Sequence, residues 1–287
     1  MKKVIVFASG LMGECTLKYL EKMGRFPTVI TSSPDIMRRR NTGCLDSLSS
    51  QFKVYESHEN KFTALPPELS DADYIVSVDW TKDYFKDSKP PFPVYHTHPS
   101  LLPLYRGYGA ISRQFMSGVK VSGLTAYLDG GSIDAGDIVF CKKIKIAYGD
   151  IPADFIKSCG EACAEFIIGL QEGKEFIPVP QAHEKAFYMA RTRNSQKVID
   201  FNASAISVYN FITAYSYPFS GGIFYYKGEK YRAMRAFVEK WEGVYGEPGE
   251  VVDKSDYGVE VACGDGTVII KETDLNTDLI EAGDMIF

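Results

Sequence analysis

Two histidines, His96 and His98, stand at the end of the apolar stretch "FPVYHTH", directly before "PSLLPLYRG". Imidazole exchanges protons near neutral pH and is also a common metal ligand. Residues two apart on a strand point to the same face, so the two rings are expected to share one cleft. The spacing is therefore compatible with a proton-transfer site and with part of a metal site.

The metal interpretation requires more ligands than these two imidazoles. The chain contains only two other histidines, His58 and His183, and both lie in polar, loop-like contexts, although Asp or Glu could complete a site. We expect no metal, and we keep a metal-dependent hydrolase that uses His96 and His98 as an alternative.

Proton transfer calls for a carboxylate partner, because a carboxylate fixes the tautomer of a histidine and tunes its pKa. We expect this partner to be Asp134 in "GGSIDAGD", a loop in which Gly130 and Gly131 permit sharp turns. Asp129 and Asp137 are the competing carboxylates in the same stretch.

The elements that must position these residues follow an α/β pattern. The run "KKVIVFAS" predicts a first strand, and apolar residues at helical spacing follow it. Further strands are predicted at "FPTVITSS", "DADYIVSVDW" and "FPVYHTH", and such alternation indicates a parallel sheet. Ligands of parallel sheets bind beyond the carboxyl ends of the strands, which is where the histidine pair lies. The turn "ASGLMGE" lacks the full dinucleotide-binding glycine pattern and is interpreted as structural.

The remainder of the chain changes character once. A short helix is predicted at "YGAISRQFMSG", two strands at "SGLTAYLD" and "DIVFCKKIKIA", and a long helix from Ile151 to about Gly173. After a helix at "SAISVYNFITAYS", short strands with Gly and Asp turns predict a small barrel. We therefore divide the chain into residues 1–190 and residues 191–287, with the boundary near Arg191–Lys197.

Composition restricts the class of protein. The 287 residues are 45% hydrophobic and 24% charged, which is typical of globular domains. The apolar start is too short for a signal peptide, no apolar run approaches the ~20 residues of a membrane span, and we expect a cytoplasmic protein without a membrane partner. The six cysteines form no C-x-x-C pair and are expected to be reduced.

The charge of the chain is unevenly distributed. The net charge is −5, and residues 201–287 alone carry 14 acidic and 7 basic residues, or −7, so the first 200 residues carry +2. Nucleic-acid affinity needs clustered Lys and Arg, which an acidic C-terminal part does not offer. The loop "SPDIMRRRNTG" is either a solvated charge run or a phosphate-facing loop.

One block and its downstream partner resemble a known family. "H-P-S-L-L-P-L-Y-R-G", followed by "G-L-T-A-Y-L-D-G-G-S-I-D-A-G-D-I-V", is similar to the folate-dependent formyltransferases, which act on methionyl-tRNA, glycinamide ribonucleotide or amino sugars. The segment "RTRNSQKVIDFNASAISVYNFITAYSYPFSGG" resembles the entry into the C-terminal domain of the tRNA enzymes. The overall character resembles most the formyltransferase domain that acts on UDP-4-amino-4-deoxy-L-arabinose.

The resemblance implies a fold and a reaction. It implies an α/β fold in which a Rossmann-like N-terminal domain precedes a small OB-like β-barrel. It implies an enzyme that transfers a formyl group from 10-formyltetrahydrofolate, its co-substrate, to a primary amine. The family's catalytic residues are an Asn-x-His pair and a downstream aspartate. His98 matches the family histidine, Asp134 matches the aspartate, and His96 stands where the family has asparagine.

The same resemblance suggests binding residues. Two segments are expected to contact the folate: Lys82, Asp83 and Tyr84 after "YIVSV", and the main chain of Gly130, Gly131, Ser132 and Ile133. Arg106 is expected either to anchor the substrate or to tie its own loop.

The chemistry of formyl transfer defines what His96 must do. The tetrahedral intermediate carries an oxyanion that needs hydrogen-bond donors, and a proton must leave the attacking amine. His96 either replaces the asparagine amide as a donor or marks a member with altered or lost chemistry. The acidic C-terminal part favours a nucleotide-linked amino sugar as the amine, with methionyl-tRNA as the alternative. A protein that only binds folate or nucleotide is a further alternative.

Overall fold

The computed structural model describes residues 1–32, 50–57, 67–80, 90–189 and 197–287, which form two compact units. The first unit contains Met1–Tyr108, Val121–Lys145 and Phe155–Met189, and the second contains Gly109–Lys120, Ile146–Asp154 and Ala190–Phe287. Each unit is described by itself. The division of the chain at residue 190 stays a prediction.

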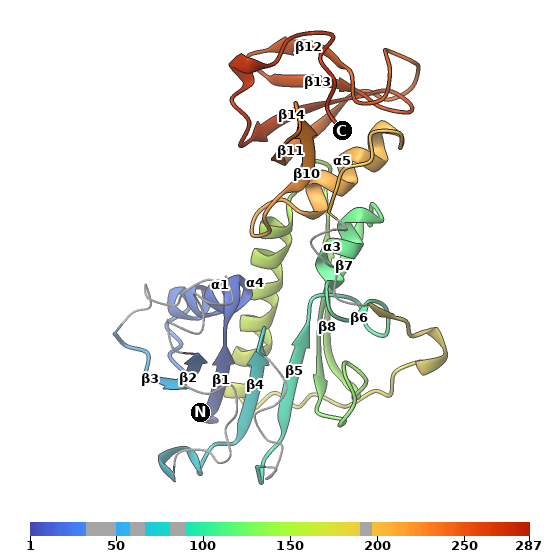
Figure 1. The fold of residues 1–287 in the computed structure, drawn as a ribbon. Coiled ribbons are helices and arrows are strands. Elements are labelled where there is room, and N and C mark those ends of the chain that lie inside the picture. The colour runs from blue at the N-terminus through green and yellow to red at the C-terminus, as the bar shows by residue number, and fades with distance from the viewer. Residues whose placement is uncertain (33–49, 58–66, 81–89, 190–196) are drawn as a thin grey trace. The chain divides into compact units, whose positions relative to one another are not determined.

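A seven-stranded sheet forms the centre of the first unit, with the strand order β3-β2-β1-β4-β5-β7-β8 (Figure 1). Its strands are β1 Val4–Ala8, β2 Thr28–Ser32, β3 Val54–Ser57, β4 Tyr74–Val78, β5 Val94–His98, β7 Val121–Leu128 and β8 Ile138–Lys145. The neighbouring strands β3, β2, β1, β4 and β5 are mutually parallel, which confirms the predicted Rossmann-like sheet. A short parallel pair, β6 (Arg106–Gly107) and β9 (Tyr188–Met189), lies outside this sheet.

The parallel strands are apolar because both of their faces are covered. Every residue of β1 is buried, and parallel strands of this kind have near-continuous apolar sequences. Phe7 packs edge-on against Trp80, with ring centroids 5.6 Å apart, in a cluster that also contains Ile5, Ile30 and Ile75. This packing holds the central strands in place, and with them the end of β5 at His98.

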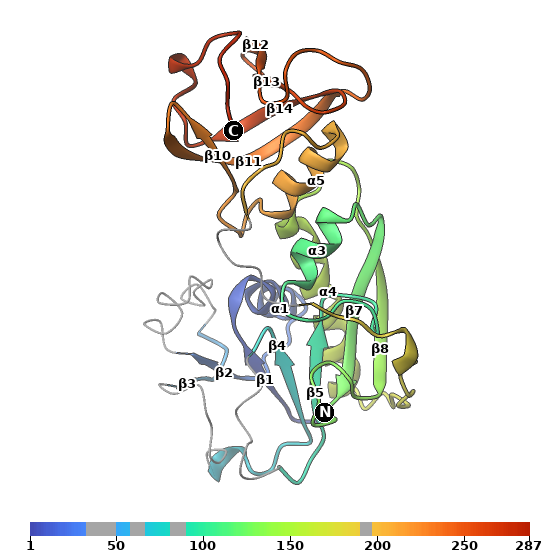
Figure 2. The same ribbon diagram turned by 45° about the vertical axis from the view of Figure 1, so that its right-hand side comes forward.

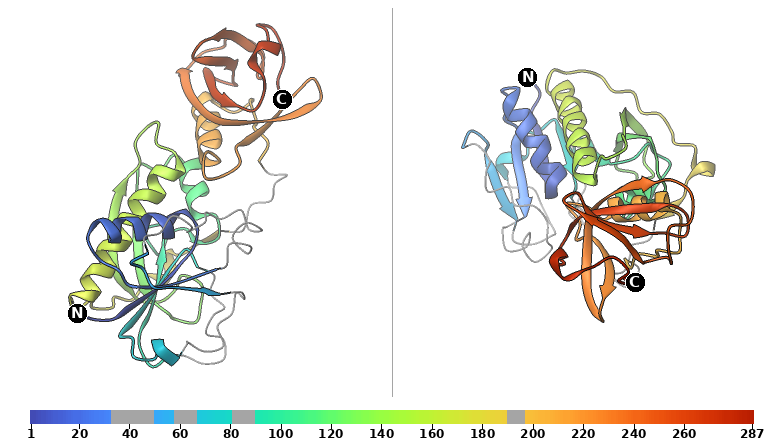
Figure 3. Two further views of the ribbon diagram at one scale, coloured as in Figure 1. Left: turned by 90° about the vertical axis from the view of Figure 1, so that its left-hand side faces the viewer. Right: turned by 90° about the horizontal axis from the view of Figure 1, so that it is seen from above.

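Helices α1 (Gly10–Lys22) and α4 (Pro152–Gln171) confirm the helices predicted at these positions, and they lie side by side (Figure 3). Gly160 permits their close approach, because a Cβ atom there would lie 2.6 Å from Cβ of Cys15. On α4, Phe166 packs against Tyr95 of β5, with ring centroids 5.4 Å apart. Since side chains alternate along a strand, His96 points to the opposite face of the sheet.

The predicted strands "SGLTAYLD" and "DIVFCKKIKIA" are β7 and β8, and both run antiparallel to their neighbours. The register of β5 and β7 places His96 opposite Tyr127 and His98 opposite Thr125. Side chains of directly opposed residues lie on the same face of a sheet. Strand β7 therefore brings a tyrosine and a threonine to the histidine face.

The second unit contains a small antiparallel barrel. Its sheet has the order β10-β11-β14-β13-β12, from β10 Gly222–Tyr226, β11 Glu229–Lys240, β12 Val251–Ser255, β13 Gly258–Ala262 and β14 Thr267–Thr273 (Figure 2). Antiparallel bridges from Met285 to Glu250 and from Ile286 to Tyr226 join its two edges. Helices α3 (Ala110–Met116) and α5 (Ala205–Ala214) belong to this unit, and α5 packs on a core that includes Phe224 and Val261.

The described cysteines are free thiols. Burial raises the pKa of Cys163 and of Cys263 to about 12 and raises that of Cys159 well above its usual value. Cys141 is exposed, and Cys44 lies outside the described residues. Among the helices that the structure describes, none is long and apolar enough to cross a membrane.

Candidate active site

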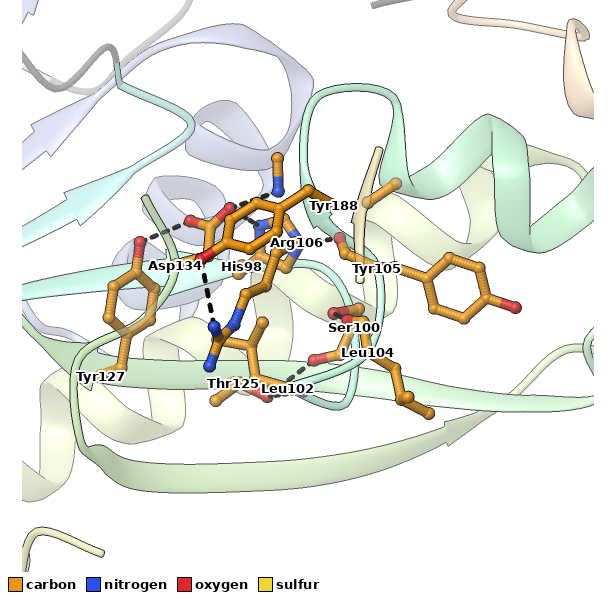
Figure 4. A network of polar contacts seen from close by, with 12 residues as sticks. His98, Ser100, Leu102, Leu104, Tyr105, Arg106, Thr125, Tyr127, Asp134 and Tyr188 are labelled. Carbon is orange, nitrogen blue, oxygen red and sulfur yellow. Dashed lines mark hydrogen bonds and ion pairs between the residues drawn. The ribbon is translucent and has the colours of Figure 1, made fainter. Parts of the chain in front are cut away.

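His98 is held at both ring nitrogens. Its Nε2 atom lies 2.7 Å from the main-chain oxygen of Tyr105, and its Nδ1 atom lies 3.5 Å from Oδ2 of Asp134 (Figure 4). A carbonyl oxygen only accepts hydrogen bonds, so the proton of the neutral ring lies on Nε2. Nδ1 is then the nitrogen that can take up a proton, and it faces a carboxylate. His98 is 6% exposed, so its ring is surrounded by protein atoms.

The loop after β5 is positioned by two buried hydroxyl groups. Thr125 of β7 donates to the main-chain oxygen of Ser100 at 2.7 Å and accepts from the N–H of Leu102 at 3.2 Å (Figure 4). Ser100 in turn donates from its own hydroxyl to the oxygen of Leu104 at 2.7 Å. At the end of the loop Tyr105 adopts φ +60°, a strained conformation for a residue with a side chain. These bonds present the Tyr105 carbonyl to His98.

The Asp134 carboxylate is surrounded by donors. Its Oδ1 accepts from the hydroxyl of Tyr127 at 2.6 Å, and its Oδ2 accepts from the N–H of Gly107 at 2.7 Å. Asp134 is 5% exposed and also has a positive φ, +53°. Both strands of this pair therefore contribute to the site. Strand β5 supplies His98, and β7 supplies Tyr127, which orients the carboxylate partner of His98.

The two ends of the loop between β7 and β8 approach each other closely at Gly130 and Gly136, and we call this close approach the neck of the loop. A Cβ atom on Gly136 would lie 1.8 Å from the oxygen of Leu128, and one on Gly130 would lie 2.9 Å from Cα of Gly136. Residues Gly130 to Ile133 are exposed, so their main chain is accessible. Asp134 of this loop contacts residues of both β5 and β7. The loop therefore folds back over the face of the sheet that carries the two histidines.

His96 has a carboxylate of its own. Its Nε2 atom lies 3.5 Å from Oδ1 of Asp129, and its ring stacks on Tyr127 with centroids 5.5 Å apart and 30° between the planes. His96 is 6% exposed, whereas the Asp129 side chain is 43% exposed. The loop thus provides one carboxylate for each histidine.

Arg106 is buried and contacts side chains from a later segment of the chain. Its side chain donates to Oε1 of Gln181 at 2.6 Å and to the hydroxyl of Tyr188 at 3.1 Å, and it lies 3.2 Å from Nδ1 of His183. Gln181 also donates to the main-chain oxygens of Asp134 and Gly136, at 3.0 and 2.6 Å. Arg106 is 2% exposed, which favours the loop-tying role that the sequence also allowed. Its role as a substrate anchor stays a prediction.

The structure brings together His96, His98 and Asp134, and it adds three residues that the sequence did not single out: Thr125, Tyr127 and Gln181. Thr125 and Tyr127 alternate with apolar residues on β7, a pattern that could have indicated them. Gln181 is distant in sequence from all its partners and had no local signal. Lys82, Asp83 and Tyr84 lie outside the described residues, as do the loop arginines and His58.

Each histidine of this site faces one carboxylate. Within the described ranges, no group of three or more His, Cys, Asp or Glu side chains could hold a metal ion. The arrangement can take a proton from a nucleophile at Nδ1 of His98 and stabilise the resulting imidazolium with Asp134.

Comparison with known proteins identifies the family. A model of the formyl transferase family matches residues 3–168, and a model of the formyl transferase C-terminal domain matches residues 191–285. The chain belongs to the formyl transferase family. This membership confirms the resemblance seen in the sequence, and both histidines and Asp134 lie within the segment matched by the first model.

Relatives within the formyl transferase family include tRNA enzymes. The chain is 30% identical over 192 residues to a methionyl-tRNA formyltransferase of Acetivibrio thermocellus, covering 66% of this chain but less than two thirds, 61%, of that relative. A methionyl-tRNA formyltransferase of Pseudothermotoga lettingae is 27% identical over 283 residues, 94% of this chain and 90% of that relative.

Solved structures of the family share this fold. WlaRD, described as a sugar 3N-formyl transferase, was solved in the presence of dTDP and 5-N-formyl-THF. It aligns with a TM-score of 0.66 at 14% identity, over 94% of this chain and 97% of WlaRD. At this identity the likeness shows that the two chains share a fold.

Proposed function

We propose that this protein transfers a formyl group from 10-formyltetrahydrofolate to a primary amine, with His96, His98 and Asp134 as catalytic residues. The observation that carries the proposal is the placement of His98, whose Nε2 is occupied by the Tyr105 carbonyl and whose Nδ1 faces Asp134 at 3.5 Å. Membership of the formyl transferase family supports the reaction class.

The proton path follows from the tautomer of His98. The amine nitrogen attacks the formyl carbon, and the carbonyl electron pair moves to oxygen. Nδ1 of His98 takes the proton that the amine loses, and Asp134 stabilises the imidazolium. When the bond between the formyl carbon and N10 of the folate breaks, this proton goes to N10. The products are a formamide and tetrahydrofolate.

The oxyanion of the tetrahedral intermediate needs a donor, and we assign this role to His96. The ring is buried, and it is oriented by the stacking of Tyr127. Loss of one such donor typically costs ~2.7–4 kcal/mol of barrier. An imidazole N–H in place of an amide therefore preserves the reaction only if its ring is held in one orientation.

The folate is proposed to contact the exposed main chain of Gly130, Gly131, Ser132 and Ile133. Exposed N–H and C=O groups at fixed positions are the usual means of orienting a heterocyclic ligand. Lys82, Asp83 and Tyr84 complete the proposed folate site. The presence of 5-N-formyl-THF in the WlaRD structure supports a folate donor.

The acceptor is proposed to be a nucleotide-linked amino sugar. Residues 201–287 carry 14 acidic and 7 basic residues, a net charge that opposes binding of the tRNA backbone. The structural likeness to WlaRD, named as a sugar enzyme, is consistent with this choice. The sequence relatives named methionyl-tRNA formyltransferase favour the second candidate, methionyl-tRNA.

An acceptor screen separates these functions. The purified protein is incubated with 10-formyltetrahydrofolate and, separately, with UDP- and dTDP-linked amino sugars, methionyl-tRNA, or buffer. Tetrahydrofolate is followed by absorbance and the formylated amine by mass spectrometry. We expect turnover with a nucleotide-linked amino sugar. Turnover with methionyl-tRNA alone would replace the sugar assignment, and folate binding without turnover on any amine would indicate a binding protein. Hydrolytic activity that depends on added zinc would support the alternative of a metal-dependent hydrolase.

A further inference from the structure

Tyr127 contacts both halves of the site through different parts of its side chain. The ring stacks on His96 at a centroid distance of 5.5 Å. The hydroxyl donates to Asp134 at 2.6 Å (Figure 4). The side chain is 1% exposed, so neither contact is replaced by bulk water. Tyr127 therefore joins the two histidine–carboxylate pairs through a single side chain.

The sheet explains why this residue can do so. Tyr127 lies directly opposite His96 in the antiparallel pair of β5 and β7, and directly opposed side chains are in contact. The loop that follows β7 folds back over the same face and brings its carboxylate to the tyrosine hydroxyl. A phenylalanine at this position would retain the first contact and lose the second.

We propose that Tyr127 is a positioning residue that holds His96 through its ring and Asp134 through its hydroxyl, so that both histidines keep one orientation during formyl transfer. The expected effect on kcat rests on the proposed function, whereas the expected effect on the positions of the side chains rests on the geometry alone. The hydroxyl donates to one oxygen of this carboxylate, and the Gly107 N–H donates to the other. Its removal allows the carboxylate to rotate away from His98.

Two variants separate the two contacts. Tyr127→Phe removes the hydroxyl and keeps the ring, whereas Tyr127→Leu removes both. Tyr226→Phe is a matched control, since Tyr226 is 4% exposed and its hydroxyl also donates to a carboxylate, Oδ2 of Asp284, at 2.7 Å. Tyr226 lies in the barrel and has no part in the proposed reaction. Both Phe variants lose a tyrosine–aspartate hydrogen bond, and Tyr226→Phe also loses the contact of the hydroxyl with the main-chain oxygen of Leu279 at 2.7 Å.

The kinetic experiment measures kcat and KM with the acceptor found active. For Tyr127→Phe we expect kcat to fall about 10- to 100-fold, the effect of a charge-assisted hydrogen bond worth ~1.5–3 kcal/mol, with KM within about twofold. Tyr226→Phe should lower the melting temperature comparably and leave kcat unchanged. Equal kcat for Tyr127→Phe and wild type, or equal losses in the two Phe variants, would overturn the proposal.

A second experiment needs no turnover and therefore distinguishes a failure of this proposal from a failure of the proposed function. Ring 13C and 15N resonances of the histidines are recorded in the substrate-free protein. We expect Tyr127→Phe to shift the ring resonances of His98 and to leave those of His96 nearly in place. Unchanged His98 resonances in Tyr127→Phe overturn the proposal even if the wild type transfers no formyl group. If Tyr127→Leu folds, loss of the ring current must also shift His96.

Discussion

Nε2 of His98 lies 2.7 Å from the main-chain oxygen of Tyr105, and this contact decides which nitrogen of the ring is available for chemistry. The carbonyl can only accept, so Nε2 carries a proton in both charge states of the ring. Every change of protonation then occurs at Nδ1, beside Asp134.

Replacement of His98 by glutamine tests this assignment. The glutamine amide reaches approximately as far as Nε2 and can still donate to the Tyr105 carbonyl, but it offers no group that titrates. We expect the His98→Gln protein to fold and to lose about 10²- to 10⁴-fold in kcat, the usual contribution of a general acid or base. Steady-state rates and a thermal melt check this. A folded variant with the wild-type rate would refute the role of His98.

Replacement of Asp134 by asparagine should be costly for a different reason. The carboxylate accepts from Tyr127 and from the Gly107 N–H, and an amide must turn its NH2 group toward one of these donors. We expect a loss of stability of about 1–3 kcal/mol from the unsatisfied pair and a large loss of kcat. Chemical denaturation and kinetics measure the two effects. A fully active Asp134→Asn protein would contradict the proposed stabilisation of imidazolium.

Replacement of His96 distinguishes a substitute donor from a lost one. His96→Asn restores the residue type of the family and an amide donor, so it should retain substantial activity. His96→Ala offers no donor, and we expect a decrease in kcat of about 10²- to 10³-fold. Parallel rate measurements on the two variants decide the question. Equal rates for wild type and His96→Ala would show that the imidazole has no role in the reaction.

Two glycines of the same loop should respond differently to substitution. A Cβ atom on Gly136 would lie 1.8 Å from the Leu128 oxygen, whereas Gly131 has no atom within 4 Å of its Cβ position and a φ of +74°. We expect Gly136→Ala to cost about 3 kcal/mol or more of stability, as main-chain clashes do. Gly131→Asn should cost under about 1 kcal/mol, because Asn tolerates positive φ. Denaturant titrations compare the variants, and similar midpoints would count against the described neck of the loop.

The cysteines should differ in their reactivity toward iodoacetamide. The thiolate is the reactive form, and burial raises the pKa of Cys159, Cys163 and Cys263, so little thiolate is present at neutral pH. Cys141 is exposed and should be labelled first. Peptide mapping by mass spectrometry identifies the labelled sites in native and unfolded protein. Rapid native labelling of Cys163 would contradict the burial of this residue of α4.

The sequence indicated the site through local patterns that the structure preserves. Apolar runs ending in polar residues predicted the strands, and a two-residue spacing predicted that His96 and His98 share a face. The sequence predicted Asp134 as a carboxylate partner of the histidines and named Asp129 as a competitor, but not that each of them faces a different histidine. Asp129 and Asp134 are both in the loop, and their assignment depends on how β7 folds back antiparallel to β5.

Arg106 shows the limit of reasoning from residue type. A lone arginine beside a conspicuous motif suggests an anion site, but its partners Gln181 and Tyr188 come from a distant segment that no local pattern links to it. Burial is a property of the tertiary fold, and it decides whether a charge faces solvent or another loop.

The hydroxyl of Thr125 ties the loop after β5 at two main-chain atoms, so this loop is ordered before any ligand arrives. The conformational entropy of fixing it is lost once, when the chain folds, and not again in each catalytic cycle. Variants that loosen this tie should therefore bind substrates with a larger entropic penalty while their chemical groups stay unchanged. The threonine influences the free energy of binding from a position where no substrate could touch it.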